Sequence, residues 1–95
     1  MRNNTKVVQV SCAMKSMYHP LRLKIVSTLN QGELSVQALV AQVGTSQSNI
    51  SQHLALLHDS GVLRSRRDGN QIFYRVGDQK TLEVLRLMQE IFCRF

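Results

Sequence analysis

The chain has 95 residues, 43% of them hydrophobic, and its 12 Lys and Arg residues exceed its 6 Asp and Glu residues to give a formal net charge of +6. This composition excludes a disordered chain and suits one modest core. No apolar run approaches the roughly 18 residues of a membrane span, and the N-terminus lacks the hydrophobic region of a signal peptide. We therefore expect one cytoplasmic domain over residues 1–95, without membrane contact, whose basic charge favours a phosphate-bearing partner.

The first half of the chain predicts three helices. Apolar residues at helical spacing indicate a helix over residues 6–18. A second helix is predicted over residues 19–32, because Pro20 suits a first helical turn. A third, short helix follows Ser35, a favourable N-cap, and ends before Gly44.

A fourth helix is predicted from Thr45 or Ser46 to about Ser60. Its buried face is a stripe spaced four and three residues apart: Ile50, Leu54 and Leu57. The opposite face carries short polar side chains, and His53 lies on its flank; the polar residues are Gln47, Ser48, Ser51 and Gln52.

The second half predicts a β-hairpin and a terminal helix. The segments "VLRSRR" and "QIFYRV" are typical of strands, and Asp68, Gly69 and Asn70 between them indicate a tight turn. The segment "QKTLEVLRLMQEIFCRF" is predicted to be helical with two apolar stripes. These stripes exceed what a small domain can bury, so we expect them to pack against a partner chain.

Two short helices joined by a glycine-containing turn indicate a helix-turn-helix, whose second helix enters the major groove of DNA. Short polar side chains reach base edges there, and the arginines of the hairpin would hold the flanking backbone. The predicted fold is thus mainly α with a small β-hairpin wing, a winged helix-turn-helix. The predicted DNA-binding residues are Thr45, Ser46, Gln47, Ser48, Ser51, Gln52, His53, Arg64, Arg66, Arg67, Asn70 and Gln71.

Three other interpretations of these features compete with this one. The polar residues could be only a capped, solvated helix start, although the arginine-rich hairpin beside them argues against it. The winged helix could dock a protein instead of DNA. An enzyme is disfavoured, because the sequence has no glycine-rich phosphate loop, metal triad or paired carboxylates. No cofactor is expected.

The residues "HPLRLKIVSTL", "GELSVQALVAQVGTSQSNISQHLALLHDSGVL" and "RRDGNQIFYRV" resemble the ArsR/SmtB family of bacterial transcriptional repressors over residues 13–95. The resemblance implies a homodimer joined through its first and last helices. It also implies binding to an inverted-repeat operator in double-stranded DNA, from which an inducer releases the protein.

The metal sites of that family have no counterpart in this sequence. Where the arsenic and cadmium class has cysteines, the stretch "ELSVQAL" has Ser35 and Gln37, which are poor ligands for soft metals. The last helix lacks the histidine of the zinc and cobalt class. We therefore assign no metal site to His19, His53 or His58.

The two cysteines, Cys12 and Cys93, are the remaining candidates for sensing. Within the family the resemblance points to the sulfide- and persulfide-responsive branch of BigR, SqrR and HlyU, which implies a thiol switch at Cys93. Ser27 stands where that branch has its second cysteine. Cys12 could supply the partner thiol, Ser27 could be an engineered replacement, or the switch could be absent. A metal or metalloid bound through the thiols, and a repressor without a small-molecule inducer, stay open as alternatives.

Overall fold

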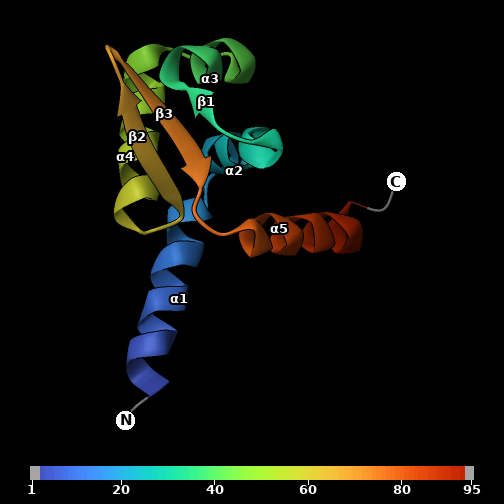
Figure 1. Ribbon diagram of the computed structural model, residues 1–95. Helices are drawn as coiled ribbons and strands as arrows, with labels where there is room; N and C mark the ends of the chain where they lie inside the picture. The colour runs from blue at the N-terminus through green and yellow to red at the C-terminus, as the bar shows by residue number, and fades with distance from the viewer. Residues whose placement is uncertain (1–2, 94–95) are drawn as a thin grey trace.

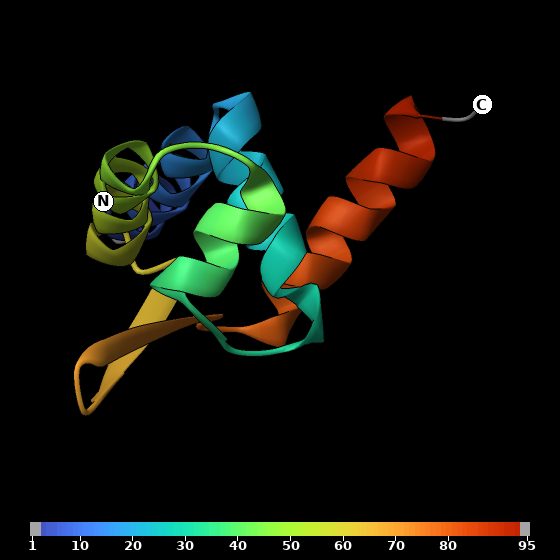
Figure 2. The ribbon, with the colours of Figure 1, turned by 90° about the horizontal axis from the view of Figure 1, so that it is seen from above.

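The computed structural model describes residues 3–93, which contain five α-helices, one short 3-10 helix and three strands arranged around a winged-helix body. The body consists of α2, α3 and α4 with the β2–β3 hairpin beside them, while α1 and α5 leave it in different directions (Figure 1, Figure 2). In chain order the elements are α1 (Asn3–Met17), α2 (Pro20–Thr28), η1 (Leu29–Gln31), β1 (Leu34–Ser35), α3 (Val36–Val43), α4 (Gln47–Asp59), β2 (Leu63–Asp68), β3 (Gln71–Val76) and α5 (Gln79–Phe92).

The core lies where α2, α3, α4 and the base of the hairpin meet. The stripe predicted on the fourth helix is buried, which confirms that prediction. Burial of these side chains is the main stabilising contribution in a domain of this size. The core residues are Ile25, Val26, Leu29, Leu39, Val43, Ile50, Leu54, Leu57, Val62, Leu63 and Val76.

The second predicted helix is shorter than expected. It begins as predicted, because Pro20 is its first residue and the His19 side chain accepts a hydrogen bond from the backbone N–H of Leu21 at 3.1 Å. It ends at Thr28, and η1 then tightens the chain before Gly32, whose φ is 132°. The helical apolar pattern continues through η1, so the sequence does not reveal this break.

Local capping fixes the turn between α3 and α4. The Ser35 side chain caps α3, and Ser46, one of the two predicted alternatives, caps α4 by accepting from the N–H of Asn49 at 3.2 Å. Gly44 takes the left-handed conformation that ends α3. The ammonium of Lys24 donates to the carbonyl of Val43 at 3.1 Å, which ties α2 to the end of α3.

The sheet has the order β1-β3-β2, with both pairs antiparallel. The predicted hairpin is confirmed, with Asp68 opposite Gln71 across a two-residue turn in which Gly69 has a φ of 63°. Strand β1 was not predicted, because two residues are too few to show an alternating pattern.

Helices α1 and α5 expose much of their apolar surface. None of the described residues of α5 is buried. The large apolar side chains that these two helices expose are Val7, Val8, Val10, Met14, Val84, Leu87, Met88, Ile91 and Phe92. Within the described part of the chain, neither these helices nor the others have the length and apolar character required to cross a membrane.

Candidate nucleic-acid interface

The outer face of α4 presents the polar side chains that the sequence placed there. Gln47, Ser48, Ser51 and Gln52 are exposed, and the buried stripe of the helix lies on the other side. The helix therefore packs on the core through its apolar face, and its neutral hydrogen-bond donors and acceptors point to solvent. A helix of this kind can enter a major groove and contact base edges.

Thr45 and Ser46 have local roles in building the start of this helix. Ser46 is the N-cap, and the hydroxyl oxygen of Thr45 accepts a hydrogen bond from the side-chain amide of Asn49 at 3.0 Å. Both side chains thus stabilise the turn that sets the orientation of α4. Contact of either side chain with DNA stays a prediction.

His53 lies deeper than its predicted flank position suggested. Its ring is half-buried and packs against that of His19, with ring centroids 4.8 Å apart. Within residues 3–93 its buried Nδ1 atom has no hydrogen-bond partner. Burial, and then the neighbouring His19 and Arg22, lower the pKa of His53 below the ordinary value for histidine. A lowered pKa disfavours the cationic form of the ring, and contact of His53 with DNA stays a prediction.

We expect acid to destabilise the fold through His53. The pKa of His53 is lower in the folded chain than in the unfolded chain, where it is about 6.5. As the pH falls below that value, the unfolded chain binds the proton more readily than the folded chain does. The free energy of unfolding therefore decreases with the pH. Between about pH 7.5 and about pH 5.5, the melting temperature of the His53→Gln variant should fall by less than that of the wild type. His58→Gln, at an exposed position on the same helix, is the matched control for the loss of one histidine side chain. Equal acid losses in the His53→Gln and wild-type proteins would contradict this assignment.

Strand register divides the wing arginines between two faces of the hairpin. Opposed residues share a face, so Ser65 and Tyr74 lie together, as do Arg67 and Ile72. This is the inner face, which meets α4, because His58 of α4 contacts both the Ser65 hydroxyl and the Tyr74 ring. The three other arginines lie on the outer face: Arg64, Arg66 and Arg75. The hairpin arginines, which were treated together in the sequence, thus form two groups, and Arg67 belongs to the face beside α4.

Arg66 already has a protein partner. Its guanidinium binds the carboxylate of Glu33 with an N–O distance of 2.7 Å and lies over the ring of Phe73, with 4.7 Å to the ring centroid. The hydrogen bond from Arg66 is the main reason that the pKa of Glu33 is lowered. Arg66 therefore anchors the wing to the loop before β1, a role that the sequence did not indicate.

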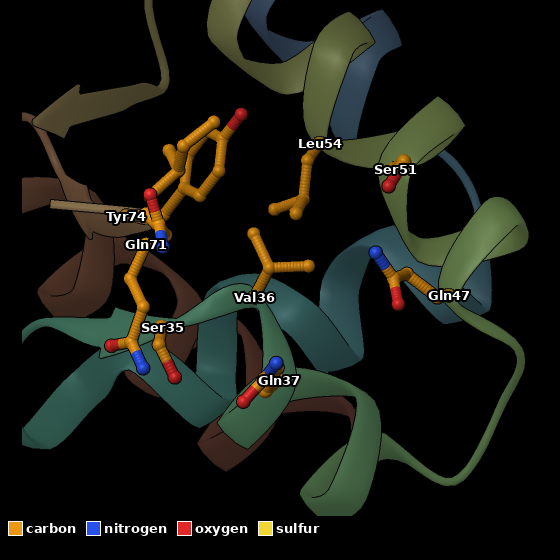
Figure 3. Close-up of a pocket in the computed structure, with 10 residues that line it drawn as sticks. Ser35, Val36, Gln37, Gln47, Ser51, Leu54, Gln71 and Tyr74 are labelled. Carbon is orange, nitrogen blue, oxygen red and sulfur yellow. The ribbon is translucent and has the colours of Figure 1, made fainter. Parts of the chain in front are cut away.

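A cavity of about 360 Å³ opens between α3, α4 and β3 (Figure 3). Val36, Leu54 and Tyr74 supply apolar surface, while Gln47 and Ser51 come from α4. The predicted residues Asn70 and Gln71 of the wing also line it, which brings the tip of the hairpin and the start of α4 to one surface. Gln37 of α3 lies there too, although the sequence had suggested it only as a lost metal ligand.

The two cysteines are exposed and lie on different helices. Cys12 belongs to α1 and Cys93 is the C-cap of α5. These helices diverge in both ribbon views, so one chain does not bring the two thiols together (Figure 1, Figure 2). Ser27 instead shares a cavity of about 310 Å³ with Gln89 of α5, and the backbone N–H of Cys93 bonds to the Gln89 carbonyl one turn earlier. Residues 3–93 contain no group of three or more His, Cys, Asp or Glu side chains placed to hold a metal.

Comparisons with known proteins show which proteins this chain is similar to. Residues 19–65 match the family described as bacterial regulatory protein, arsR family. The biofilm growth-associated repressor of Xylella fastidiosa is 40% identical over 85 residues, which cover 90% of this chain and 75% of that protein. The transcriptional activator HlyU of Vibrio cholerae is 31% identical, over 98% of this chain and 83% of that protein.

Two solved structures have the same fold. The crystal structure of the transcriptional repressor BigR from Xylella fastidiosa has a TM-score of 0.83 and 37% identity, and the match covers 98% of this chain and 97% of that one. The homodimeric winged helix-turn-helix DNA-binding domain Mb0332 from Mycobacterium bovis has a TM-score of 0.86 and 28% identity, with coverage of 95% and 83%. The expected winged helix-turn-helix is therefore confirmed.

Proposed function

Because this chain belongs to the arsR family of bacterial regulatory proteins, we propose that it represses transcription as a cytoplasmic homodimer bound to an inverted-repeat operator. Membership of this family also confirms the prediction that the chain is a DNA-binding transcriptional regulator and not an enzyme. One observation carries the proposal most directly: the neutral polar face of α4 and the inner face of the wing border the same cavity.

These two elements suit different parts of a DNA duplex. Gln47 and Ser51 can hydrogen-bond to base edges in the major groove, where amide and hydroxyl groups discriminate between bases. Arg67 on the inner face can neutralise a backbone phosphate beside that groove. The excess of 12 basic over 6 acidic residues adds a sequence-independent attraction.

We expect Gln47→Ala and Arg67→Ala to weaken DNA binding in different ways. An operator is first selected from randomised duplexes, and affinities are then measured by fluorescence anisotropy over a range of salt concentrations. Gln47→Ala should cost about 1–3 kcal/mol and relax the sequence preference at one position of each half-site. Arg67→Ala should weaken all sequences similarly and lower the salt slope by about 1 for each phosphate that is no longer neutralised.

Gln42→Ala provides the control for these variants, because Gln42 is exposed on α3 but does not line the cavity between α3, α4 and β3. It should bind like the wild type. Failure to select any sequence, or wild-type affinity in both Gln47→Ala and Arg67→Ala, would refute the proposed DNA interface.

The apolar surfaces of α1 and α5 support the homodimer. Large aliphatic side chains on a small basic protein are unfavourable in water, and burying them against a second copy removes that cost. The Mycobacterium bovis domain, whose fold this chain shares, is homodimeric, which supports a homodimer here.

The thiols supply the switch in this proposal. The thiols of Cys12 of one subunit and Cys93 of the other would lose two protons and two electrons to form a disulfide. A persulfide would accept them and be reduced to a thiol and hydrogen sulfide, or another two-electron oxidant would take its place, and the bridged dimer would bind the operator poorly. The two thiols are exposed, as reaction with a soluble oxidant requires. A bridge between subunits is preferred because α1 and α5 diverge within one chain. A metal or metalloid held by the same thiols is the alternative, and it would need further ligands.

We expect Cys93→Ser to bind operator normally and to lose the response to an oxidant. Treatment of the wild type with peroxide or a polysulfide should give a covalent dimer on a non-reducing gel, since a bridge between subunits links two chains. Operator affinity should fall in parallel, and a thiol reductant should restore it.

Cys12→Ser tests which thiol completes the bridge and should match Cys93→Ser in losing the covalent dimer. Ser27→Cys is the matched gain-of-function variant, because Ser27 borders one cavity with Gln89, which lies one turn before Cys93. Oxidation of this variant should form a disulfide between positions 27 and 93 of one chain. Intact mass spectrometry should then show a monomer lighter by the mass of two hydrogen atoms. Operator release by oxidant in Cys93→Ser would exclude the thiol switch.

A further inference from the structure

Two buried polar atoms, one on α2 and one on α4, have no hydrogen-bond partner within residues 3–93. They are the Nε atom of Arg22 and the Nδ1 atom of His53, and both belong to basic side chains that are half-buried. Buried polar groups in folded proteins are nearly always hydrogen-bonded, because an unpaired group loses its hydration without compensation. A bound water molecule or ion is a usual partner of such atoms.

The charges around these two atoms are all of one sign. Burial lowers the pKa of His53, and so do the nearby side chains of His19 and Arg22, whereas no carboxylate is among the causes. We call His19, Arg22 and His53 the basic cluster. Within the described residues, none of the three side chains forms a salt bridge with a carboxylate. A water molecule could satisfy a donor of the basic cluster, but only an anion would also offset its positive charge.

The donors of the basic cluster suit an anion and not a metal ion. The His19 ring accepts a hydrogen bond at Nδ1 from the backbone N–H of Leu21 at 3.1 Å. A neutral imidazole that accepts at Nδ1 carries its proton on Nε2, so the other nitrogen of this ring is a donor and not a metal ligand. The Nε atom of Arg22 is also a donor, and the guanidinium charge repels a cation.

His19 lies on the solvent side of the basic cluster. Its side chain is exposed, and its ring packs against that of His53 with 4.8 Å between the ring centroids. Exposed side chains change position on a timescale of picoseconds to nanoseconds. We therefore expect a small ion to reach the buried atoms by displacing the His19 ring outward, without any movement of a core side chain.

We propose that the basic cluster binds a small inorganic oxyanion of the phosphate or sulfate type between α2 and α4. Such an ion accepts hydrogen bonds from guanidinium and imidazole groups and carries the charge that the cluster lacks. Through His19, whose backbone N–H bonds to the carbonyl of Met17 at 2.8 Å, the bound ion would connect α4 to the turn that follows α1. The inference goes beyond the proposed function, because it requires neither DNA nor a thiol.

The test titrates the wild-type protein with sodium sulfate or sodium phosphate at pH 7.5, and with sodium chloride at equal ionic strength. Histidine ring resonances are followed by NMR. The ring resonances of His53 should shift along a saturating curve with either oxyanion, while those of the exposed His58 should not shift and chloride should have little effect. The melting temperature should rise by roughly 5–10 °C at about ten times the dissociation constant, since the ion binds the folded chain alone.

Matched variants separate this site from the general stabilising effect of sulfate and phosphate, which does not saturate and acts on every variant. Arg22→Gln and His53→Gln should each lose the saturating part of the rise in melting temperature. Lys80→Gln removes the same charge as Arg22→Gln from an exposed position and should keep it, as should His58→Gln. If Arg22→Gln does not fold, the resonances of the wild type and the His53→Gln variant still decide the question.

Three results would overturn the inference: His53 resonances that do not respond to either oxyanion, an equal response to chloride, or a saturating rise that persists in the His53→Gln variant. A His53 ring that responds only when operator DNA is added would also overturn it, because the occupant would then be a backbone phosphate and not a free ion. None of the other three results bears on operator binding, so the proposed function is tested separately through Gln47→Ala and Arg67→Ala.

Discussion

Replacement of Leu87 and Ile91 by glutamate is expected to convert the protein to a monomer and to lower operator affinity by about 10²–10⁴-fold, the advantage that linking two binding modules provides. These side chains are 49% and 60% exposed on α5, so the substitution removes apolar surface without opening the core. A charge placed there would have to be desolvated when two copies meet. The chain should therefore fold and read a half-site, but it should no longer hold two half-sites at once.

Light scattering after size exclusion measures the first part of this expectation. The variant should elute with the mass of one 10.8 kDa chain, and the wild type with twice that mass. Gln79→Glu/Gln89→Glu adds the same charge to exposed positions of α5 outside its large apolar side chains and serves as the control. A dimeric Leu87→Glu/Ile91→Glu variant with intact operator binding would show that α5 is not the dimer surface.

Leu54→Ala should cause the largest loss of stability, about 2–5 kcal/mol, because it leaves a cavity in the core. Leu54 is 1% exposed and is the middle residue of the apolar stripe that seats α4. A domain of this size has only about 5–15 kcal/mol of stability in total. Urea unfolding should therefore show a much lower midpoint, and operator binding should fall because α4 is no longer held in place.

Leu56→Ala supplies a matched control on the same helix. It removes the same atoms from a side chain that is 50% exposed, two residues away, and should change stability by less than about 1 kcal/mol. Similar midpoints for the Leu54→Ala and Leu56→Ala variants would mean that α4 is not seated on the core through its apolar stripe.

Sequence alone predicted the elements whose signals are local. The stripe of Ile50, Leu54 and Leu57, the cap at Ser35 and the turn around Gly69 each depend on spacing or backbone chemistry within a few residues. All three occur as predicted, and together they were sufficient for the winged helix-turn-helix.

Features that depend on tertiary contacts could not be predicted in this way. The burial of His53 follows from its contact with His19, more than 30 positions earlier in the chain. The pairing of Arg66 with Glu33 depends on the loop before β1, a strand too short to be recognised. The separation of Arg67 from the other wing arginines requires the register of β2 and β3, which decides the face of every side chain.

In the proposed homodimer, the apolar surfaces of α1 and α5 also determine how repression responds to gene dosage. If two chains make each operator-binding unit, the amount of that unit follows the square of the chain concentration wherever free monomers predominate. Halving synthesis would then reduce the active form about fourfold, so a cell could relieve repression sharply by a modest drop in expression. The exposed side chains that would join the subunits include Leu87 and Ile91. Through them, the number of copies of the regulator in the cell would control repression in addition to any chemical signal.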